Sequence, residues 1–405
     1  MKVAPGRETI ERRQFIALVA TFCLVGMVIV GQLYAAIPLI PRISAAWQVT
    51  PGSAAWATSA FAIAYACGSL ASGPLSNRWG RRSVMVTGAV VMAVATALVP
   101  LATSLGTGSL VRAMQGLPAG AFVPMAYAHL SATLPRRRLP LALTLVSASM
   151  GGTVVLGQVQ AQLIESAFGW RAVFWLTAPL VVVGAVAVHR VMGPTAQPTP
   201  AGETRGGETL HSVSPPVRLM PLYGITLLVA GSLTAIYTGV QLYGPAALVA
   251  NQGALLGLRA SVLPALLCAV LIAPVLGRRL SVDTRVVGAF TVAAAGMAGA
   301  TLLADSPIGV GAALFILMIG ISTAGPALVQ AIGSGAGAKQ TTAIAGYGFM
   351  LNIGGGIGAQ LPPLFDDLAA LALTIAGILA CAVVYLGVSA HRRGTFTRLP
   401  MRRQA

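Results

Sequence analysis

Apolar stretches, each about as long as a lipid bilayer is thick, alternate with short polar stretches along the whole chain. A helix needs about 20 apolar residues to cross the hydrocarbon core of a membrane. Twelve stretches of roughly this length can be placed from the pattern alone. They cover residues 14–37, 53–75, 84–101, 109–133, 139–164, 171–190, 219–243, 254–276, 285–303, 308–331, 340–364 and 369–390. The pattern predicts an all-α polytopic membrane protein with twelve transmembrane helices.

The twelve stretches fall into two sets of six. A polar stretch rich in Pro, Gly, Ser and Thr lies between them and has the composition of a flexible linker. We expect a cytoplasmic N-terminus at 1–13, a six-helix bundle at 14–190, a cytoplasmic linker at 191–218, a second six-helix bundle at 219–390 and a basic cytoplasmic tail at 391–405.

Three tripeptides recur at equivalent places in the two sets. Gly-Arg-Arg, Ala-Gln-Leu and Gln-Leu-Tyr begin at Gly80 and Gly277, at Ala161 and Ala359, and at Gln32 and Gln241. Internal duplication is typical of transporter folds, in which the substrate site lies between the repeats near the middle of the membrane. The repeats therefore indicate two pseudo-symmetric bundles.

The charged residues are few and unevenly placed. Only 9% of the 405 residues are charged, against about 25% in ordinary soluble domains, so much of the surface must face lipid. With the N-terminus inside, 22 of the 26 cations fall on cytoplasmic segments, which places both termini in the cytoplasm. We expect a bacterial inner (plasma) membrane protein whose basic segments contact anionic lipids. The net charge of +17 comes in short clusters, which argues against nucleic-acid binding.

The sequence shows no set of residues typical of a disulfide framework, a metal site or an enzyme active site. The four cysteines lie inside apolar stretches and form no CxxC pair, so we expect no disulfide and no metal site. The sequence contains no phosphate-binding GxxxxGK[ST] motif and no arrangement of residues typical of catalysis. We expect no cofactor, no catalytic residue and no enzyme activity.

The stretch from Gly73 to Met85, Gly-Pro-Leu-Ser-Asn-Arg-Trp-Gly-Arg-Arg-Ser-Val-Met, separates the second and third spans. It is predicted as a short loop that folds the two spans into an antiparallel hairpin. With the six-plus-six pattern, it resembles the G-x-L-a-D-r-x-G-r-r signature of the major facilitator superfamily. The matching residues are Gly73, Leu75, Arg78, Gly80, Arg81 and Arg82, while Asn77 stands where that family has Asp.

Three further motifs resemble the same family. Arg112, Gln115 and Gly116 match its R-x-x-Q-G pattern in the fourth span. The sequence Gly169, Trp170, Arg171 and Phe174 is similar to the turn into the sixth span of drug-efflux members. The antiporter signature of the fifth span is matched in part by Gly151, Gly152 and Gly157, with Gln158 in place of its Pro.

The resemblance implies a monomeric secondary transporter that works by alternating access. It implies proton-coupled efflux of a drug-like, sugar-like or other small organic compound. It also implies that Gly73, Asn77, Arg78, Gly80, Arg81 and Arg82 form a conformational gate. An uptake symporter, an uncoupled facilitator and a non-transporting membrane sensor of the same fold remain alternatives.

A charged side chain inside a membrane helix is a functional candidate by default, because its insertion is costly. Arg112, Gln115 and Gly116 share one helix face; the alternative is an arginine that reaches the outer membrane surface. Other polar residues in apolar stretches are further candidates. The predicted substrate or cavity residues are Gln32, Tyr34, Arg112, Gln115, Tyr127, Gln158, Tyr237, Gln241, Asn352 and Gln360.

Residues that could carry a proton are scarce, since none of the nine acids falls clearly inside a predicted span. The candidates are His129, Glu165, Asp366 and Asp367. The lack of a central carboxylate argues against selection for cationic substrates. Arg112 and Arg259 instead favour neutral or anionic ones.

Overall fold

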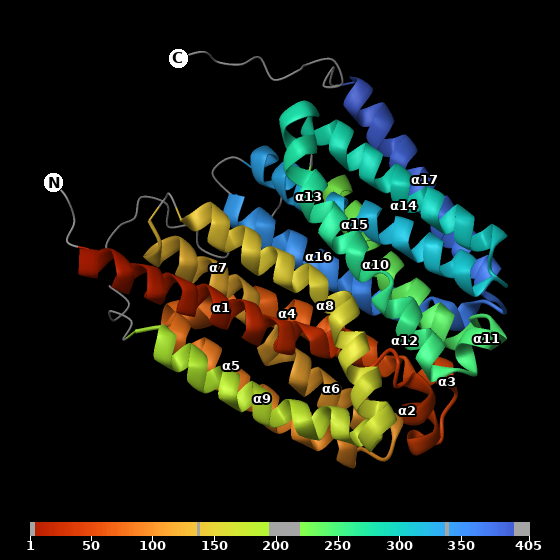
Figure 1. The fold of residues 1–405 in the computed structure, drawn as a ribbon, viewed down its shortest axis with the longest axis horizontal. Helices are drawn as coiled ribbons and strands as arrows, with labels where there is room; N and C mark the ends of the chain where they lie inside the picture. Colours follow the sequence, from red (N-terminus) through yellow and green to blue (C-terminus); the bar gives the residue numbers. More distant parts are fainter. Residues whose placement is uncertain (1–4, 136–137, 194–218, 337–339, 393–405) are drawn as a thin grey trace. The chain divides into compact units, whose positions relative to one another are not determined.

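The structure, a computed structural model, describes residues 5–135, 138–193, 219–336 and 340–392 (Figure 1). Within these ranges every regular element is a helix, which confirms the predicted all-α class. The greater part of the predicted linker (194–218) and of the basic tail (393–405), together with residues 1–4, lies outside the described residues.

Nine stretches of the described residues are long and apolar enough to cross a membrane. Seven of the predicted spans thus appear as one long helix each. The second span also has a short helix before its long one, and the third has a 3₁₀ turn after its long one. The elements are α1 (Pro5–Ala35), α3 (Pro51–Ala54) with α4 (Trp56–Trp79), α5 (Arg81–Leu98) with the 3₁₀ turn η1 (Val99–Leu101), α8 (Leu139–Phe168), α9 (Trp170–Val191), α10 (Met220–Tyr243), α14 (Val282–Leu302), α15 (Pro307–Gly335) and α17 (Leu368–Arg392).

The other three predicted spans are also helical, and two of them are interrupted. The fourth consists of α6 (Leu105–Ala119) and α7 (Phe122–Thr133), the eighth of α12 (Gln252–Ala260) and α13 (Leu263–Arg279), and the eleventh of α16 (Gln340–Gln360). The interruption after α6 begins four residues before Pro124, and the interruption after α12 begins three residues before Pro264. A proline ring clashes with the carbonyl group four residues earlier, so the helix ends there. Short helices α2 (Ile40–Trp47), α11 (Ala246–Val249) and η5 (Pro362–Leu364) lie in connections.

The predicted loop between the second and third spans is wrong in extent. Helix α4 continues to Trp79, and α5 begins at Arg81, so Gly80 alone separates them. Gly80 has a φ angle of +79°, a conformation that residues with a Cβ atom rarely adopt. The chain direction therefore changes at one residue, and most of the stretch that starts at Gly73 is helical.

The chain separates into two compact units, called here the N-terminal unit and the C-terminal unit. The first contains Met1–Leu39, Ala46–Gln48 and Ala60–Ser212, and the second contains Ile40–Ala45, Val49–Ser59 and Val213–Ala405. The start of the second span belongs to the C-terminal unit because Ser59 contacts α16. The Ser59 hydroxyl donates to the carbonyl oxygen of Gly356 (2.7 Å) and accepts a hydrogen bond from Gln360 Nε2 (2.9 Å).

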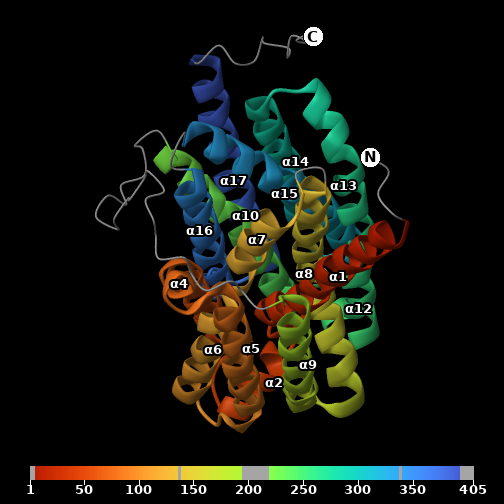
Figure 2. The same cartoon turned by 90° about the vertical axis from the view of Figure 1, so that its left-hand side faces the viewer.

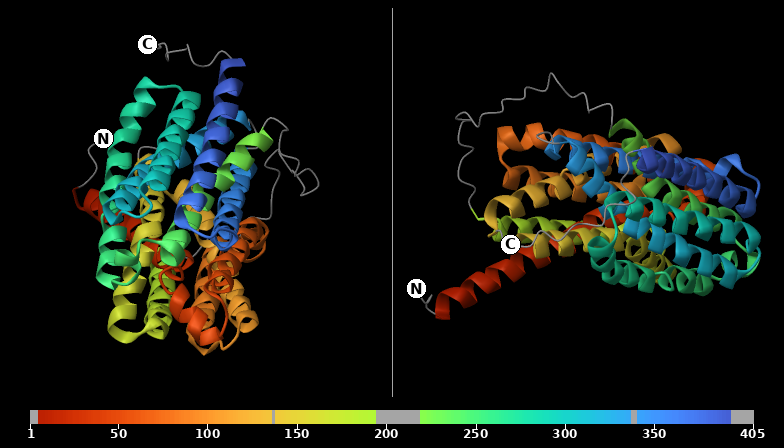
Figure 3. Two further views of the ribbon diagram at one scale, coloured as in Figure 1. Left: turned by 90° about the vertical axis from the view of Figure 1, so that its right-hand side faces the viewer. Right: turned by 90° about the horizontal axis from the view of Figure 1, so that it is seen from above.

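Helices pack in the same order in both units. In the N-terminal unit α1 packs against α8, and α5 packs against α9 (Figure 2). In the C-terminal unit α10 packs against α16, and α14 packs against both α15 and α17 (Figure 3). In terms of spans, first pairs with fifth and third with sixth in each set. The duplication predicted from three tripeptides is therefore repeated in the packing.

Glycines allow the first and fifth spans of each unit to approach closely. A Cβ atom on Gly157 of α8 would lie 2.6 Å from the carbonyl oxygen of Gly31 on α1. In the C-terminal unit, a Cβ atom on Gly358 of α16 would overlap the carbonyl oxygen of Gly231 on α10. Small residues drive helix association in membranes in this way, because they let backbones meet.

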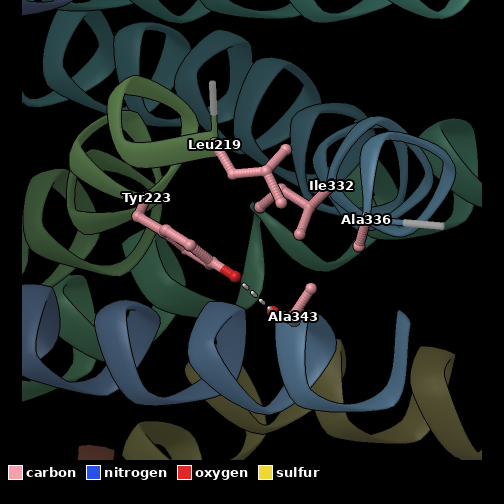
Figure 4. Packing of buried hydrophobic residues seen from close by; sticks show 5 residues of the cluster. All are labelled: Leu219, Tyr223, Ile332, Ala336 and Ala343. Carbon is pink, nitrogen blue, oxygen red and sulfur yellow. Dashed lines mark hydrogen bonds between the residues drawn. The ribbon is translucent and has the colours of Figure 1, made fainter. Parts of the chain in front are cut away.

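A compact apolar cluster joins α10, α15 and α16 in the C-terminal unit (Figure 4). Its members are Leu219, Tyr223, Ile332, Ala336 and Ala343. The hydroxyl of Tyr223 donates a hydrogen bond to the carbonyl oxygen of Ala343 (3.1 Å). The Tyr223 ring therefore packs in the apolar cluster, while its hydroxyl group has a hydrogen-bond partner.

The glycine contact predicts opposite effects for one substitution at two positions of α8. Gly157→Ala should lower the apparent Tm, because overpacking costs about 1–3 kcal/mol. Gly151→Ala is the matched control, since a Cβ atom there meets nothing within 4 Å, and the better helix propensity of Ala favours it by about 1 kcal/mol. Thermal unfolding of both purified variants in detergent measures the difference. Equal Tm values would show that the α1–α8 contact does not constrain the fold.

Candidate functional site

Arg112 lies on α6 within the N-terminal unit, and none of its surface is exposed. The helix begins at a capping box, in which the Ser104 hydroxyl accepts from the backbone N–H of Thr107 and the Thr107 hydroxyl accepts from the N–H of Ser104. Such a box fixes the start of a helix and so places Arg112 two turns further on. Its guanidinium is enclosed by other residues of the unit and does not end at the protein surface.

The guanidinium group of Arg112 is held by hydrogen bonds and by aromatic rings. One nitrogen donates to the backbone carbonyl of Gln32 on α1 (2.8 Å), and another donates to Oε1 of Gln115. The guanidinium carbon lies 4.5 Å from the ring centre of Phe61 and 5.8 Å from that of Phe174. Cation–π attraction increases when the cation is desolvated. Together these contacts offset part of the cost of burying the charge.

Gln115 extends this contact into a network across four helices. Its Nε2 donates to the hydroxyl of Thr96 on α5 (2.9 Å) and to Oε1 of Gln32 (3.3 Å). Gln32 Nε2 in turn donates to the hydroxyl of Thr177 on α9 (3.4 Å). We call the set Gln32, Thr96, Arg112, Gln115 and Thr177 the arginine network. It joins α1, α5, α6 and α9.

Two members of the arginine network, Thr96 and Thr177, were missed by the sequence analysis. Each hydroxyl also donates to the carbonyl four residues earlier, Met92 or Val173. This back-bonding is common for threonine in any membrane helix. Their sequence neighbourhood therefore carries no signal that separates them from other threonines.

The glycines on the same face of α6 bring α4 close to the network. A Cβ atom on Gly116 would overlap the carbonyl oxygen of Phe61, and one on Gly120 would overlap that of Tyr65. This approach sets the Phe61 ring beside the guanidinium of Arg112. The predicted helix face therefore combines a cation, an amide and a close helix contact.

The other candidates of the N-terminal unit lie outside the arginine network. Tyr34 is buried, and the Tyr127 hydroxyl is hydrogen-bonded to that of Ser147 on α8 (2.9 Å). Gln158 Nε2 donates to the carbonyl of Val154 in its own helix (2.7 Å). None of these contacts singles the residues out as ligand-binding groups.

A second buried arginine occurs in the C-terminal unit. Arg259 is 2% exposed, and its NH2 nitrogen donates to Oε1 of Gln241 on α10 (2.6 Å). Gln32 and Gln241, which open the repeated Gln-Leu-Tyr tripeptides, thus each accept a hydrogen bond from a buried arginine. Arg259 was not among the predicted cavity residues, although it was one of four cations placed away from the cytoplasmic segments. Its position away from the cytoplasmic segments was the signal that could have identified Arg259 as a candidate.

The two remaining cavity candidates, Asn352 and Gln360, lie on α16. Asn352 Nδ2 donates to the carbonyl of Gly348 in the same helix (2.8 Å), and Gln360 bonds Ser59 as described above. Both contacts are structural within the C-terminal unit.

The structure separates the four proton-carrier candidates by burial. Glu165 is 9% exposed and lies in the last turn of α8, which extends beyond the predicted end of the span. Asp366 and Asp367 are exposed, and Asp367 Oδ1 accepts the backbone N–H of Ala370 at the start of α17 (2.7 Å). His129 is buried, with its ring edge-on to that of Phe22 at 5.9 Å. Among the described carboxylates, Glu165 alone is buried.

The predicted gate residues lie at the turn between α4 and α5. Gly73, Asn77 and Arg78 are in the last turns of α4, and the Asn77 side chain is exposed. Beyond Gly80, Arg81 donates to the carbonyl of Ala128 (3.1 Å) and Arg82 to that of His189 (2.7 Å). These bonds tie the start of α5 to α7 and to the end of α9.

Comparison with known proteins gives one family and several relatives. A profile of the Major Facilitator Superfamily matches residues 22–359. The multidrug resistance protein MdtG of Enterobacter lignolyticus (strain SCF1) is 27% identical over 402 residues, which cover 94% of each chain. MdtG of Dickeya zeae (strain Ech586) is 29% identical over 190 residues, 45% of this chain and 46% of that one.

A third relative is the tetracenomycin C resistance and export protein of Streptomyces glaucescens. It is 29% identical over 132 residues, 33% of this chain and 24% of that protein. The chain therefore spans about a quarter of this relative and about half of the Dickeya one, but nearly all of the Enterobacter one.

The arginine network predicts a stability cost for Gln115→Leu. The substitution removes an acceptor of Arg112 and the donor to Thr96, and it leaves both groups buried. Lost hydrogen bonds of this kind cost about 1–3 kcal/mol, so the apparent Tm should fall by several degrees. Gln160→Leu on α8 is the control, because Gln160 is partly exposed and outside the network. A Gln115→Leu protein as stable as the control would contradict the network.

Proposed function

Because the chain belongs to the major facilitator superfamily, we propose that it exports a small organic compound across the membrane in exchange for protons. The chain is a multi-pass membrane protein and a transporter of this superfamily. We propose the direction of transport, the coupling ion and the class of substrate. The compound class is drug-like, sugar-like or another small organic molecule.

One observation carries the proposal: a fully buried, hydrogen-bonded arginine lies inside the N-terminal helical unit. Intramembrane charges are rare because they are costly, and they are retained where they bind a substrate or relay ions. A helix bundle that needed only stability could fill this space with apolar side chains. The arginine network therefore points to binding, with Arg112 and Gln115 as the groups that would contact the transported compound.

Efflux is favoured over uptake by the relatives. The full-length match is named a multidrug resistance protein, and a shorter match is named a resistance and export protein. An uptake symporter or an uncoupled facilitator remains the second candidate, because the described spans hold no carboxylate near their middle.

In the proposed cycle, the two units alternate between states that open the binding site to one side of the membrane and then to the other. The turn at Gly80 would act as part of the gate at the cytoplasmic face, since Arg81 and Arg82 hold α5 to two other helices. Asn77 can donate and accept hydrogen bonds but carries no charge, so its contribution to the gate would depend little on ionic strength.

Glu165 is the proposed proton carrier. It is buried at the end of α8 on the same face as Gln158 and Gln162, which follow the spacing i, i+4, i+7. A buried carboxyl group can exchange a proton when its surroundings change from dry to wet. Movement of the units would supply such a change.

Transport by everted membrane vesicles tests the function directly. Respiration acidifies the interior of the vesicles, and acridine orange reports this pH gradient. Tetracycline, chloramphenicol, norfloxacin or arabinose is then added. A compound that exchanges for protons dissipates the gradient in vesicles with the protein and leaves it intact in vesicles with Arg112→Met. Uptake of radiolabelled compound that proceeds equally without a gradient would establish the uncoupled facilitator instead.

The coupling role predicts a split between two kinds of transport for Glu165→Gln. Uphill accumulation driven by the pH gradient should fall more than tenfold, because the amide cannot carry a proton. Exchange of labelled for unlabelled compound, which needs no net proton movement, should continue. Asp305→Asn, which neutralises an exposed carboxylate, should leave both unchanged. Parallel loss of both transport modes in Glu165→Gln would assign the residue to folding or substrate binding.

A further inference from the structure

Helix α10 of the C-terminal unit carries buried hydroxyl groups with unmet hydrogen-bonding capacity. Among the described residues, the side-chain oxygens of Ser232, Tyr237 and Thr238 are buried without a hydrogen-bond partner. Tyr237 is the largest of these, with 2% of its surface exposed. Buried tyrosines usually place their hydroxyl on a partner, and a buried polar group left without one is destabilising. Its retention therefore needs an explanation.

The Tyr237 hydroxyl shares its surroundings with Arg259. Tyr237 and Gln241 are one turn apart on α10, and Gln241 holds the NH2 nitrogen of Arg259 at 2.6 Å. The Tyr237 phenol and the Arg259 guanidinium are close enough to interact electrostatically. An unused O–H donor thus lies beside a buried cation within a single unit. Two such groups together suit a hydrogen-bond acceptor, above all a negatively charged one.

The N-terminal unit differs from this site in how far its buried side-chain oxygens are satisfied. In the arginine network the side-chain oxygens of Gln32, Gln115, Thr96 and Thr177 all have partners. The contact of Arg259 with Gln241 likewise explains how α12 is joined to α10. It does not explain the Tyr237 hydroxyl, which takes no part in that contact.

We propose that Tyr237, Gln241 and Arg259 form a subsite for an anionic or strongly hydrogen-bond-accepting group of the transported compound. The inference rests on the proposed function and names its substrate class. The phenol donates to an oxygen of the ligand, such as a carboxylate or phenolate oxygen, and Arg259 supplies the positive potential. A cationic group is disfavoured at this position by the same charge.

Two dyes of similar shape and opposite charge test the subsite. Fluorescein is an anion at neutral pH, and rhodamine 123, built on the same ring system, is a cation. Binding of each to the purified full-length protein in detergent is measured by fluorescence anisotropy. The unaltered protein should bind fluorescein at least tenfold more tightly than rhodamine 123. Tyr237→Phe should weaken the binding of fluorescein about tenfold and change that of rhodamine 123 less than twofold.

The matched control is Tyr223→Phe on the same helix. The Tyr223 hydroxyl is satisfied by the Ala343 carbonyl (3.1 Å; Figure 4), so its removal should lower the apparent Tm and leave dye binding unchanged. Tyr237→Phe removes an unsatisfied hydroxyl, so its Tm should stay the same or rise while fluorescein binding falls. A purely structural tyrosine would not give this combination.

The remaining outcomes separate the subsite from the function. Failure of the unaltered protein to bind fluorescein, a preference for rhodamine 123, or equal fluorescein binding by Tyr237→Phe each overturns the subsite. Transport of a neutral or cationic compound in the vesicle assay would still stand in those cases. Fluorescein binding that depends on Tyr237, without proton-coupled transport of fluorescein or of any other compound in the vesicle assay, would support the subsite and overturn the proposed proton-coupled export.

Discussion

Close contact between helix backbones is the constraint on which this structure depends. Helices in lipid gain little from the hydrophobic effect when they meet, so their association relies on packing and hydrogen bonds. Glycines provide this contact where α8 meets α1 and where α16 meets α10. A third contact, of Gly116 with the Phe61 backbone, brings an aromatic ring to the buried guanidinium. The polar chemistry of the N-terminal unit is therefore positioned by residues that have no side chain.

The two buried arginines show two different uses of the same side chain. Arg112 is enclosed by a backbone carbonyl, an amide and two rings, in a network whose side-chain oxygens have partners. Arg259 bonds an amide and lies near a phenol that has no partner among the described residues. To bind a ligand, the complete network must give up one of its own hydrogen bonds. The incomplete one has an O–H donor to spare, at a cost in stability.

The sequence was sufficient to predict the class of fold and the spans, because length and apolarity alone decide which stretches can cross a bilayer. It was also sufficient to select Arg112, Gln115 and Gln32, since polar residues are conspicuous in apolar helices. Helix ends were less predictable. Helix α4 continues through Asn77, and α8 continues beyond Glu165, because polar residues near a membrane surface do not stop a helix.

Partners were the least predictable part of the site. The breaks before Pro124 and Pro264 follow from proline geometry, yet Pro74 stands within α4 without ending it. Which proline interrupts a helix thus depends on its neighbours in space. The same holds for the hydroxyls of Thr96 and Tyr237, one satisfied and the other not, which no local pattern distinguishes.

The turn between α4 and α5 carries a mechanical consequence. With Gly80 as the sole link, the end of α4 and the start of α5 cannot separate, and Arg81 and Arg82 fasten that start to α7 and α9, so these four helices must travel together at this end of the unit.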